Sequence, residues 1–149
     1  MKGERTKKEG SMQDDNARKA LARLVSEAIN TKNLALLDAH PGFWETRQIF
    51  PHLFIGFPDV QDTIEQQTCD GEWVTTRTTL RGTHTGPFMG LPPSGQAITM
   101  MTVSLDQVVD GKVVQHFGVA DWASALSMMG LIPPAPSDPK KEGRKEVLL

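Results

Sequence analysis

The segment QAITMMTVSLDQVVDGKVVQHFGVAD, residues 96–121, holds two runs rich in Val, Thr and Met on either side of Asp110-Gly111. Val and Thr favour strands, and an Asp-Gly pair between two such runs is typical of a hairpin turn. Odd- and even-numbered side chains of the first run form two faces, both largely apolar. We therefore predict an antiparallel hairpin, with one face lining a cavity and the other meeting a helix or a second subunit.

Two more strand-like runs precede this hairpin. VQDTIEQQTCD, residues 60–70, and GEWVTTRTTLRGTHT, residues 71–85, meet at the turn Asp70-Gly71. Sequential strands joined by tight turns predict an antiparallel meander. The long connection RGTHTGPFMGLPPSGQ, residues 81–96, spaces its glycines like a phosphate loop. Gln96 stands where that loop needs Lys, and Pro92 and Pro93 lack N–H donors, so nucleotide binding is excluded here.

Helices are predicted before the strands and once after them. Asp14 or Asp15 can cap a helix that runs to about Asn30 with one apolar stripe. Short helices are predicted over 33–37 and 44–54, and WASALSMMG, residues 122–130, forms a last helix ending at Gly130. This order predicts an α+β fold whose N-terminal helices cover the concave face of a curved antiparallel sheet.

Composition predicts one domain over residues 13–134. The tails, residues 1–12 and 135–149, are rich in charge, Pro and Gly, and we predict that they are disordered. Between the tails, eight basic residues face 13 acidic ones without a basic stripe. Nucleic-acid phosphates require clustered Lys and Arg, so nucleic acid is not an expected partner.

Few residues suit a metal or a disulfide. Cys69 is the single cysteine, and the four His residues are far apart and lack the i, i+4 spacing of a helical metal site. No apolar run reaches the 18 to 20 residues that a membrane span needs. We therefore predict a cytoplasmic protein with no metal and no membrane partner.

Residues 57–130 as a block resemble the SnoaL-like ester and polyketide cyclase family, within the nuclear transport factor two-like superfamily. The matching features are spread along the block rather than gathered in one motif. They are Phe57-Pro58-Asp59, the Gly71 turn before a strand with Arg77, Gly82-Thr83-His84-Thr85-Gly86, Gly90 with Pro92, Pro93 and Gly95, Asp110-Gly111-Lys112, His116, and Asp121 before the closing helix.

The resemblance implies a cone-shaped α+β barrel with a pocket inside it. It also implies a cofactor-independent enzyme that acts by acid/base proton transfer at carbon in a hydrophobic carbonyl compound, polyketide- or terpenoid-like, such as cyclisation, isomerisation or dehydration. Such chemistry needs one base in an apolar cavity and one donor for the enolate. The expected partners are a hydrophobic small molecule and a second copy of the chain. The alternative is a noncatalytic ligand-binding or assembly module of the same fold.

The sequence departs from the antibiotic cyclase branch of the family at the acid/base positions. The resemblance places those positions at Gly118 and Ser104, and neither residue is a strong acid or base. The chain also contains no Tyr, which removes the phenol donor of some steroid isomerases of this fold. Other groups must therefore carry any chemistry.

Three catalytic candidates follow from these patterns. Asp121 is the predicted acid/base, although an Asp there also suits an N-cap of the last helix. His116 lies five residues earlier and shares its face only if Gly118 forms a bulge; otherwise it is a hydrogen-bonding residue. His84 ends its strand on the face of Thr76, and it is either catalytic or an anchor for the long loop.

The predicted ligand contacts are mostly soft or aromatic side chains. Met and aromatic residues suit a polycyclic ligand, although core packing or a dimer contact explains them as well. An Arg on the second strand can bind a carboxylate or carbonyl, or it can lie exposed. The set comprises Trp44, Arg77, Phe88, Met100, Thr102, Phe117 and Trp122.

Overall fold

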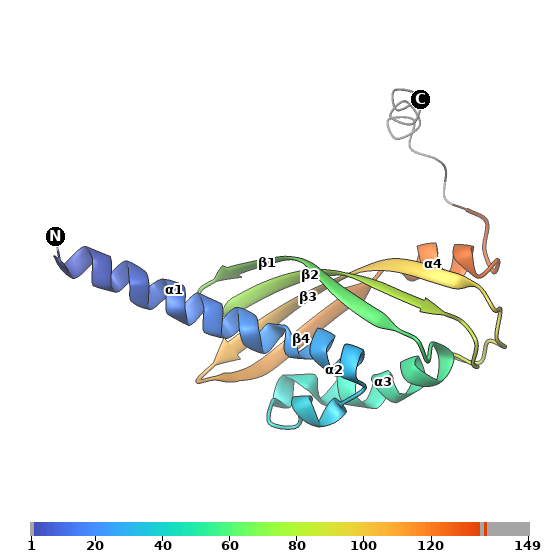
Figure 1. Cartoon of the computed structure of the whole chain (residues 1–149), viewed down its shortest axis with the longest axis horizontal. Helices are drawn as coiled ribbons and strands as arrows, with labels where there is room; N and C mark the ends of the chain where they lie inside the picture. Colours follow the sequence, from blue (N-terminus) through green and yellow to red (C-terminus); the bar gives the residue numbers. More distant parts are fainter. Residues whose placement is uncertain (1, 135, 137–149) are drawn as a thin grey trace.

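The computed structural model describes residues 2–134 and 136, with side chains from residue 11 onward (Figure 1). Helices come first, four strands follow, and a short helix closes the domain, as predicted. The elements are α1 (Lys2–Ala22), α2 (Leu24–Thr31), the 3-10 helices η1 (Leu34–Leu37) and η2 (Pro41–Phe43), α3 (Trp44–Gly56), β1 (Gln61–Asp70), β2 (Trp73–Thr83), β3 (Ala97–Val109), β4 (Lys112–Ala120) and α4 (Trp122–Met128).

The four strands form one antiparallel sheet in the order β1-β2-β3-β4. This confirms the predicted α+β meander. The sheet is curved, and α2 and α3 lie on one side of it (Figure 1). Strands β1 and β4 are edges and do not pair with each other, so the sheet is open rather than the closed barrel that the word cone suggests.

The register of the last hairpin contains one irregularity. Pairing runs without interruption from Thr102 opposite Ala120 to Gln107 opposite Gln115, and then shifts so that Val108 lies opposite Val113. Val114 is therefore the extra residue of a β-bulge, and Gly118 lies in regular pairing rather than in the bulge considered from the sequence. Because the bulge absorbs one residue, Val113 and His116 both face the helices.

The N-terminal helix differs from the prediction in two ways. It is split at Arg23 into α1 and α2, and its helical backbone begins at Lys2, within the segment 1–12 that composition predicted to be disordered. Lys, Arg, Glu and Gln are good helix formers, which accounts for a helix without an apolar face there. The tail predicted over 135–149 lies outside the described residues, except for Pro136. None of the described helices has the length and apolar character that crossing a membrane requires.

The buried side chains form two separate hydrophobic clusters beneath the sheet. One comprises Ile29, Leu53, Phe57, Val60, Leu80, Phe88, Ile98, Met100, Ala125 and Met129, and the other Ala22, Ala28, Leu37, Phe43, Val74, Val108 and Val113. On the same face of β2 and β3, the positions between the clusters are polar: Thr76 and Thr78 on β2, and Thr102, Ser104 and Asp106 on β3. We call these five residues the polar band.

Candidate functional site

A cavity of about 290 Å³ lies between the helices and the polar band. Its volume is close to the lower end of the range for small-molecule sites. The apolar part of its wall includes Val25, Ile29, Phe50, Leu53, Leu80, Phe88, Met100 and Trp122. The polar part includes Ser26, Thr46, Asp62, Thr76, Thr78, Thr102, Ser104 and His116. A ligand there would meet a mostly apolar surface with hydroxyl and titratable groups along one side.

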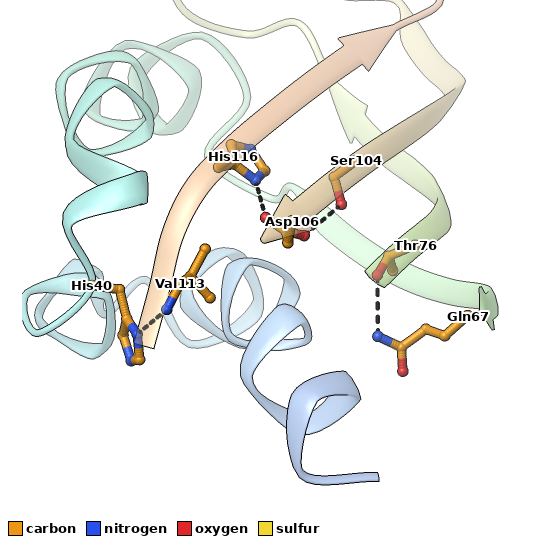
Figure 2. A network of polar contacts seen from close by, with 7 residues as sticks. All are labelled: His40, Gln67, Thr76, Ser104, Asp106, Val113 and His116. Carbon is orange, nitrogen blue, oxygen red and sulfur yellow. Dashed lines mark hydrogen bonds and ion pairs between the residues drawn. The ribbon is translucent and has the colours of Figure 1, made fainter. Parts of the chain in front are cut away.

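One wall of the cavity carries a histidine held by a buried carboxylate (Figure 2). Asp106 on β3 and His116 on β4 are direct cross-strand partners, and Asp106 Oδ1 lies 2.6 Å from His116 Nδ1. The Ser104 hydroxyl donates to the other oxygen of Asp106 at 3.2 Å. Asp106 is fully buried, so its carboxylate holds the ring from within the protein.

The rest of the His116 ring is constrained by its neighbours. Phe43 packs edge-on against it, with ring centroids 5.2 Å apart. His116 Nε2 lies 3.2 Å from where a Cβ on Gly118 would stand, and Gly118 lines the cavity. A carboxylate on Nδ1 favours the tautomer that carries its proton there and leaves a lone pair on Nε2. This arrangement orients a base at the cavity wall.

A second carboxylate of the wall comes from β1. Asp62 is buried and accepts hydrogen bonds from the Ser26 hydroxyl at 2.6 Å and the Thr78 hydroxyl at 2.7 Å. Thr78 is in turn 2.7 Å from the Thr102 hydroxyl. Burial raises the pKa of the Asp62 carboxyl, and the hydrogen bonds from Ser26 and Thr78 offset part of that rise.

Asp121 lies outside the cavity lining. It is exposed at the start of α4, where it accepts hydrogen bonds from the Ser124 backbone N–H at 3.1 Å and the Ser124 hydroxyl at 2.5 Å. The hydroxyl, and then the backbone N–H, hold the pKa of the Asp121 carboxyl below its usual value. This geometry is that of a helix N-cap.

His84 is fully buried, and it too is not part of the cavity lining. Its Nδ1 accepts the Ser94 backbone N–H at 3.1 Å and lies 2.9 Å from the Ser94 hydroxyl. The ring stacks on Phe57 with centroids 5.2 Å apart. These contacts tie both ends of the connection between β2 and β3 together, which is the anchoring arrangement considered from the sequence.

The predicted ligand contacts divide according to the face of the sheet. Phe88, Met100, Thr102 and Trp122 line the cavity. Arg77 and Phe117 lie on the opposite face, where Phe117 stacks on Trp73, because their positions alternate with inward ones. Trp44 is 66% exposed at the start of α3 and lies outside the lining. The structure thus brings four of the seven together.

Asp106 was missed from the sequence because of the Val114 bulge. Regular pairing outward from the Asp110-Gly111 turn would set Asp106 opposite Gln115, not His116. Asp62 had a weak indication in the sequence, since Ser26 and Asn30 are polar residues one turn apart beside an apolar stripe. Both of these contact Asp62.

Ser104 and Gly118, the positions that the resemblance equates with the acid/base pair, lie opposite each other and line the cavity. The Asp106–His116 pair is two residues further along the same strands. Among the residues that the structure describes, no group of three or more His, Cys, Asp or Glu side chains could hold a metal ion.

The chain is similar to several polyketide cyclases in sequence. The model for SnoaL-like polyketide cyclases matches residues 11–127. Nogalonic acid methyl ester cyclase of Streptomyces nogalater is 34% identical over 60 residues, which are 40% of this chain and 45% of that protein. Aklanonic acid methyl ester cyclase DnrD of Streptomyces peucetius is 30% identical over 67 residues, 45% of this chain and 46% of that protein. The chain thus spans about half the length of the curated relatives it matches.

Solved structures share the fold over a larger part of the chain. AclR, a candidate hydroxylase from Streptomyces galilaeus, aligns with a TM-score of 0.74 and 26% identity over 90% of this chain and 94% of its own. IdmH, a candidate polyketide cyclase from Streptomyces antibioticus, aligns with a TM-score of 0.63 and 27% identity over 76% of this chain and 98% of its own. With the match of the family model over 11–127, these likenesses lead to one conclusion: the chain belongs to the SnoaL-like polyketide cyclase family.

Proposed function

We propose that this chain is a cofactor-independent enzyme that transfers a proton at a carbon next to a carbonyl in a hydrophobic, polyketide-like compound, with ring closure as the reaction. Membership in the family supports a cyclase-type activity. Two matching relatives are cyclases of nogalonic and aklanonic acid methyl esters by name, which supports a polyketide ester as the substrate class. The mostly apolar cavity supports a hydrophobic ligand.

His116 is the proposed base, and its geometry is the observation that carries the proposal. Its Nε2 takes the proton from the carbon, and Asp106, 2.6 Å from Nδ1, orients the ring and stabilises the imidazolium that forms. The resulting enolate carbon forms a C–C bond to a second carbonyl carbon of the same molecule, and that carbonyl oxygen takes up a proton. The product is an isomer of the substrate, so proton transfers alone complete the reaction.

Turnover of aklanonic acid methyl ester, followed by chromatography and mass spectrometry, tests this proposal. We expect His116→Gln to lower kcat by roughly 10²- to 10⁴-fold, because a positioned acid/base group contributes about that much. Asp106→Asn should also lower kcat, since an amide can hold the other tautomer of the ring. Circular dichroism checks that both variants are folded.

Asp121→Asn is the matched control for these variants. Its carboxylate caps α4 outside the cavity lining, so we expect turnover close to that of the wild type. A folded Asp121→Asn protein without activity, together with an active His116→Gln protein, would contradict the assignment of the base.

A noncatalytic binding module is the second candidate function. It is favoured by Ser104 and Gly118, which occupy the positions that the resemblance equates with an acid/base pair. Calorimetric binding of the ester without conversion, unchanged in His116→Gln, would favour this candidate. Both functions require a hydrophobic small molecule as partner, and the expected homodimer stays a prediction.

A further inference from the structure

The Asp62 carboxyl lies between the cavity and the outer surface of the protein. Only 7% of the residue is exposed, yet it lines both the cavity and a shallow depression on the outside. Ser26 also lines both, and the remaining wall of the depression includes Arg23, Glu27, Asn30 and Thr63. Asp62 and Ser26 are therefore the residues that the two hollows share.

Helix α2 holds this carboxyl in a fixed position. Ser26 and Asn30 are one turn apart on α2, and the Asn30 amide bonds both backbone groups of Asp62, accepting from N–H at 2.7 Å and donating to C=O at 2.8 Å. The Ser26 hydroxyl donates to Asp62 Oδ2 at 2.6 Å. Oδ2 accepts from Ser26, and Oδ1 accepts from the Thr78 hydroxyl when the carboxyl is ionised; Oδ1 is the oxygen that we assign the proton when the carboxyl is protonated.

A chain of hydroxyls leads from Oδ1 into the cavity. Asp62 Oδ1 and Thr78 Oγ1 are 2.7 Å apart, and Thr78 Oγ1 and Thr102 Oγ1 are also 2.7 Å apart. A threonine hydroxyl donates one hydrogen bond and accepts others. When Asp62 is protonated, every donor in this chain can point toward the cavity, and Thr102 presents an O–H to a ligand. When Asp62 is ionised, the donors point the other way.

No cation neutralises this carboxyl among the described residues, whose ion pairs do not involve Asp62. None of the charged groups described near Asp62 makes a hydrogen bond or an ion pair with its carboxyl. In the wall of the depression, Arg23 bonds Gln67 and Glu27 is exposed. In the wall of the cavity, His116 bonds Asp106 and Glu45 is exposed. Lys32 bonds the Val60 carbonyl, Glu65 accepts from Thr79, and Arg77 and Arg81 are exposed. Burial without a cation raises the pKa of the Asp62 carboxyl, which favours its protonated form.

We propose that Asp62 is a second acid/base group of the cavity, which delivers a proton through Thr78 and Thr102 to the oxygen of a bound carbonyl compound. This inference rests on the proposed function and assigns the donor that the reaction needs. The Thr102 proton moves to the ligand oxygen, the Thr78 proton moves to Thr102, and the Asp62 proton moves to Thr78. Asp62 ends ionised and regains a proton from water in the outer depression, while His116 releases its proton to water.

One bound molecule can contact donor and base together, because Thr102 and His116 lie on the neighbouring strands β3 and β4 and both line the cavity. His116 Nε2 stands beside Gly118, and Thr102 is the diagonal cross-strand neighbour of Gly118. The C–H that His116 deprotonates lies next to one carbonyl, and the oxygen that takes the proton from Thr102 belongs to the second carbonyl, which the enolate carbon attacks. The proposed substrate class is therefore an enolisable ketone or β-keto ester that carries a second carbonyl group.

The pH dependence of kcat with aklanonic acid methyl ester tests this inference. In the wild type we expect the rate to fall on the alkaline side as Asp62 loses its proton. Asp62→Asn and Thr78→Val should each lower kcat by about a hundredfold or more and remove this alkaline fall. Thr79→Val is the matched control: Thr79 lies on the opposite face of β2, outside the cavity lining, and donates to Glu65, so the alkaline fall should remain. A wild-type alkaline fall in both Asp62→Asn and Thr78→Val would overturn the inference.

A titration that needs no turnover separates this inference from the proposed function. In protein labelled with ¹³C at the Asp carboxyls, the Asp62 resonance is the one missing from Asp62→Asn. We expect it to titrate above the ordinary range of Asp, and to move higher still in Thr78→Val, which removes a donor to the carboxylate. An ordinary titration would overturn the inference even if the ester is converted. No conversion by the wild type would instead overturn the proposed function, and the titration would still show whether the pKa of the Asp62 carboxyl is raised.

Discussion

Gly118 leaves the space that the His116 imidazole uses. A Cβ at this position would stand 3.2 Å from Nε2, which is tighter than ordinary contact. A larger side chain at 118 would therefore compete with the ring for the same part of the cavity wall. Position 118 carries no carboxylate, so the sequence alone suggests that an acid/base group is missing there. In the structure, the missing side chain leaves room for the ring of His116.

Single residues were the least predictable level of this site. His116 was a candidate because of its residue type, but its partner depends on a register that no residue type reveals. The Asp121 pattern was compatible with both a cap and an acid/base group, and only the position of Ser124 distinguishes the two geometries. The hydrogen bonds of Asp62 to Ser26 and Asn30 could not be predicted from the sequence, because they depend on the packing of α2 against β1.

The stability of the protein should depend on pH through Asp62. A carboxyl whose folded pKa is raised contributes stability that is complete below its unfolded pKa and is lost as the pH rises through the folded pKa. Asp62→Asn lacks this loss, so its stability relative to the wild type should rise with pH, by roughly 1.4 kcal/mol for each unit of raised pKa. Urea unfolding from pH 4 to pH 8 measures the difference, and a constant difference would contradict the raised pKa.

Strands and helices were predicted well because their patterns are local. The Asp110-Gly111 turn and the alternation of β3 predict correctly which side chains of that hairpin face the helices. The prediction holds along all of β3 and, on β4, from the turn to Val113. Bulges depend on both strands at once, and the sequence of β4 alone gave no reason to choose Val114 over Gly118. The break between α1 and α2 lies at Arg23, where the sequence has neither Gly nor Pro to indicate it.

The cap of α4 allows a prediction at the level of one element. Asp121→Ala removes acceptors for the Ser124 N–H and hydroxyl, so the melting temperature should fall slightly at neutral pH. Because the pKa of Asp121 is lowered in the folded state, its stabilisation is present above the unfolded pKa and is lost as the pH falls through the folded pKa. The two proteins should therefore converge in acid. Calorimetry at several pH values would refute the cap if the difference grew in acid.

At the scale of the whole molecule, the cavity lies at the polar band, between two clusters of buried residues that share the partly buried Val25. The band lies between the clusters on β2 and β3, and α2 and α3 lie on one side of the sheet (Figure 1). An apolar band would let the two clusters pack into one core. The sequence contained this information in the inward positions of β2, where Val74 and Leu80 enclose two threonines, but the strands had to be placed before it could be interpreted.

A ligand in this cavity should stabilise the whole domain. At a ligand concentration one hundred times Kd, the free energy of unfolding should increase by about 2.7 kcal/mol. Aklanonic acid methyl ester should accordingly raise the melting temperature of the wild type. Ala120→Phe, which places a ring in the cavity from β4, is the control and should abolish the increase while the protein stays folded. An equal increase in both proteins would place the ligand elsewhere.

The Val114 bulge has a consequence for how the gene can change. Loss of the codon for Phe117 would let β4 keep its pairing from Gly118 onward and use the bulged residue to restore a regular ladder. The strand would remain intact, but Gln115 would then oppose Asp106 and His116 would face outward. A one-codon deletion that keeps the pairing of β4 would thus replace the histidine of this wall with a glutamine. Because of the bulge, the residue opposite Asp106 can change in one step while the strand stays in the sheet.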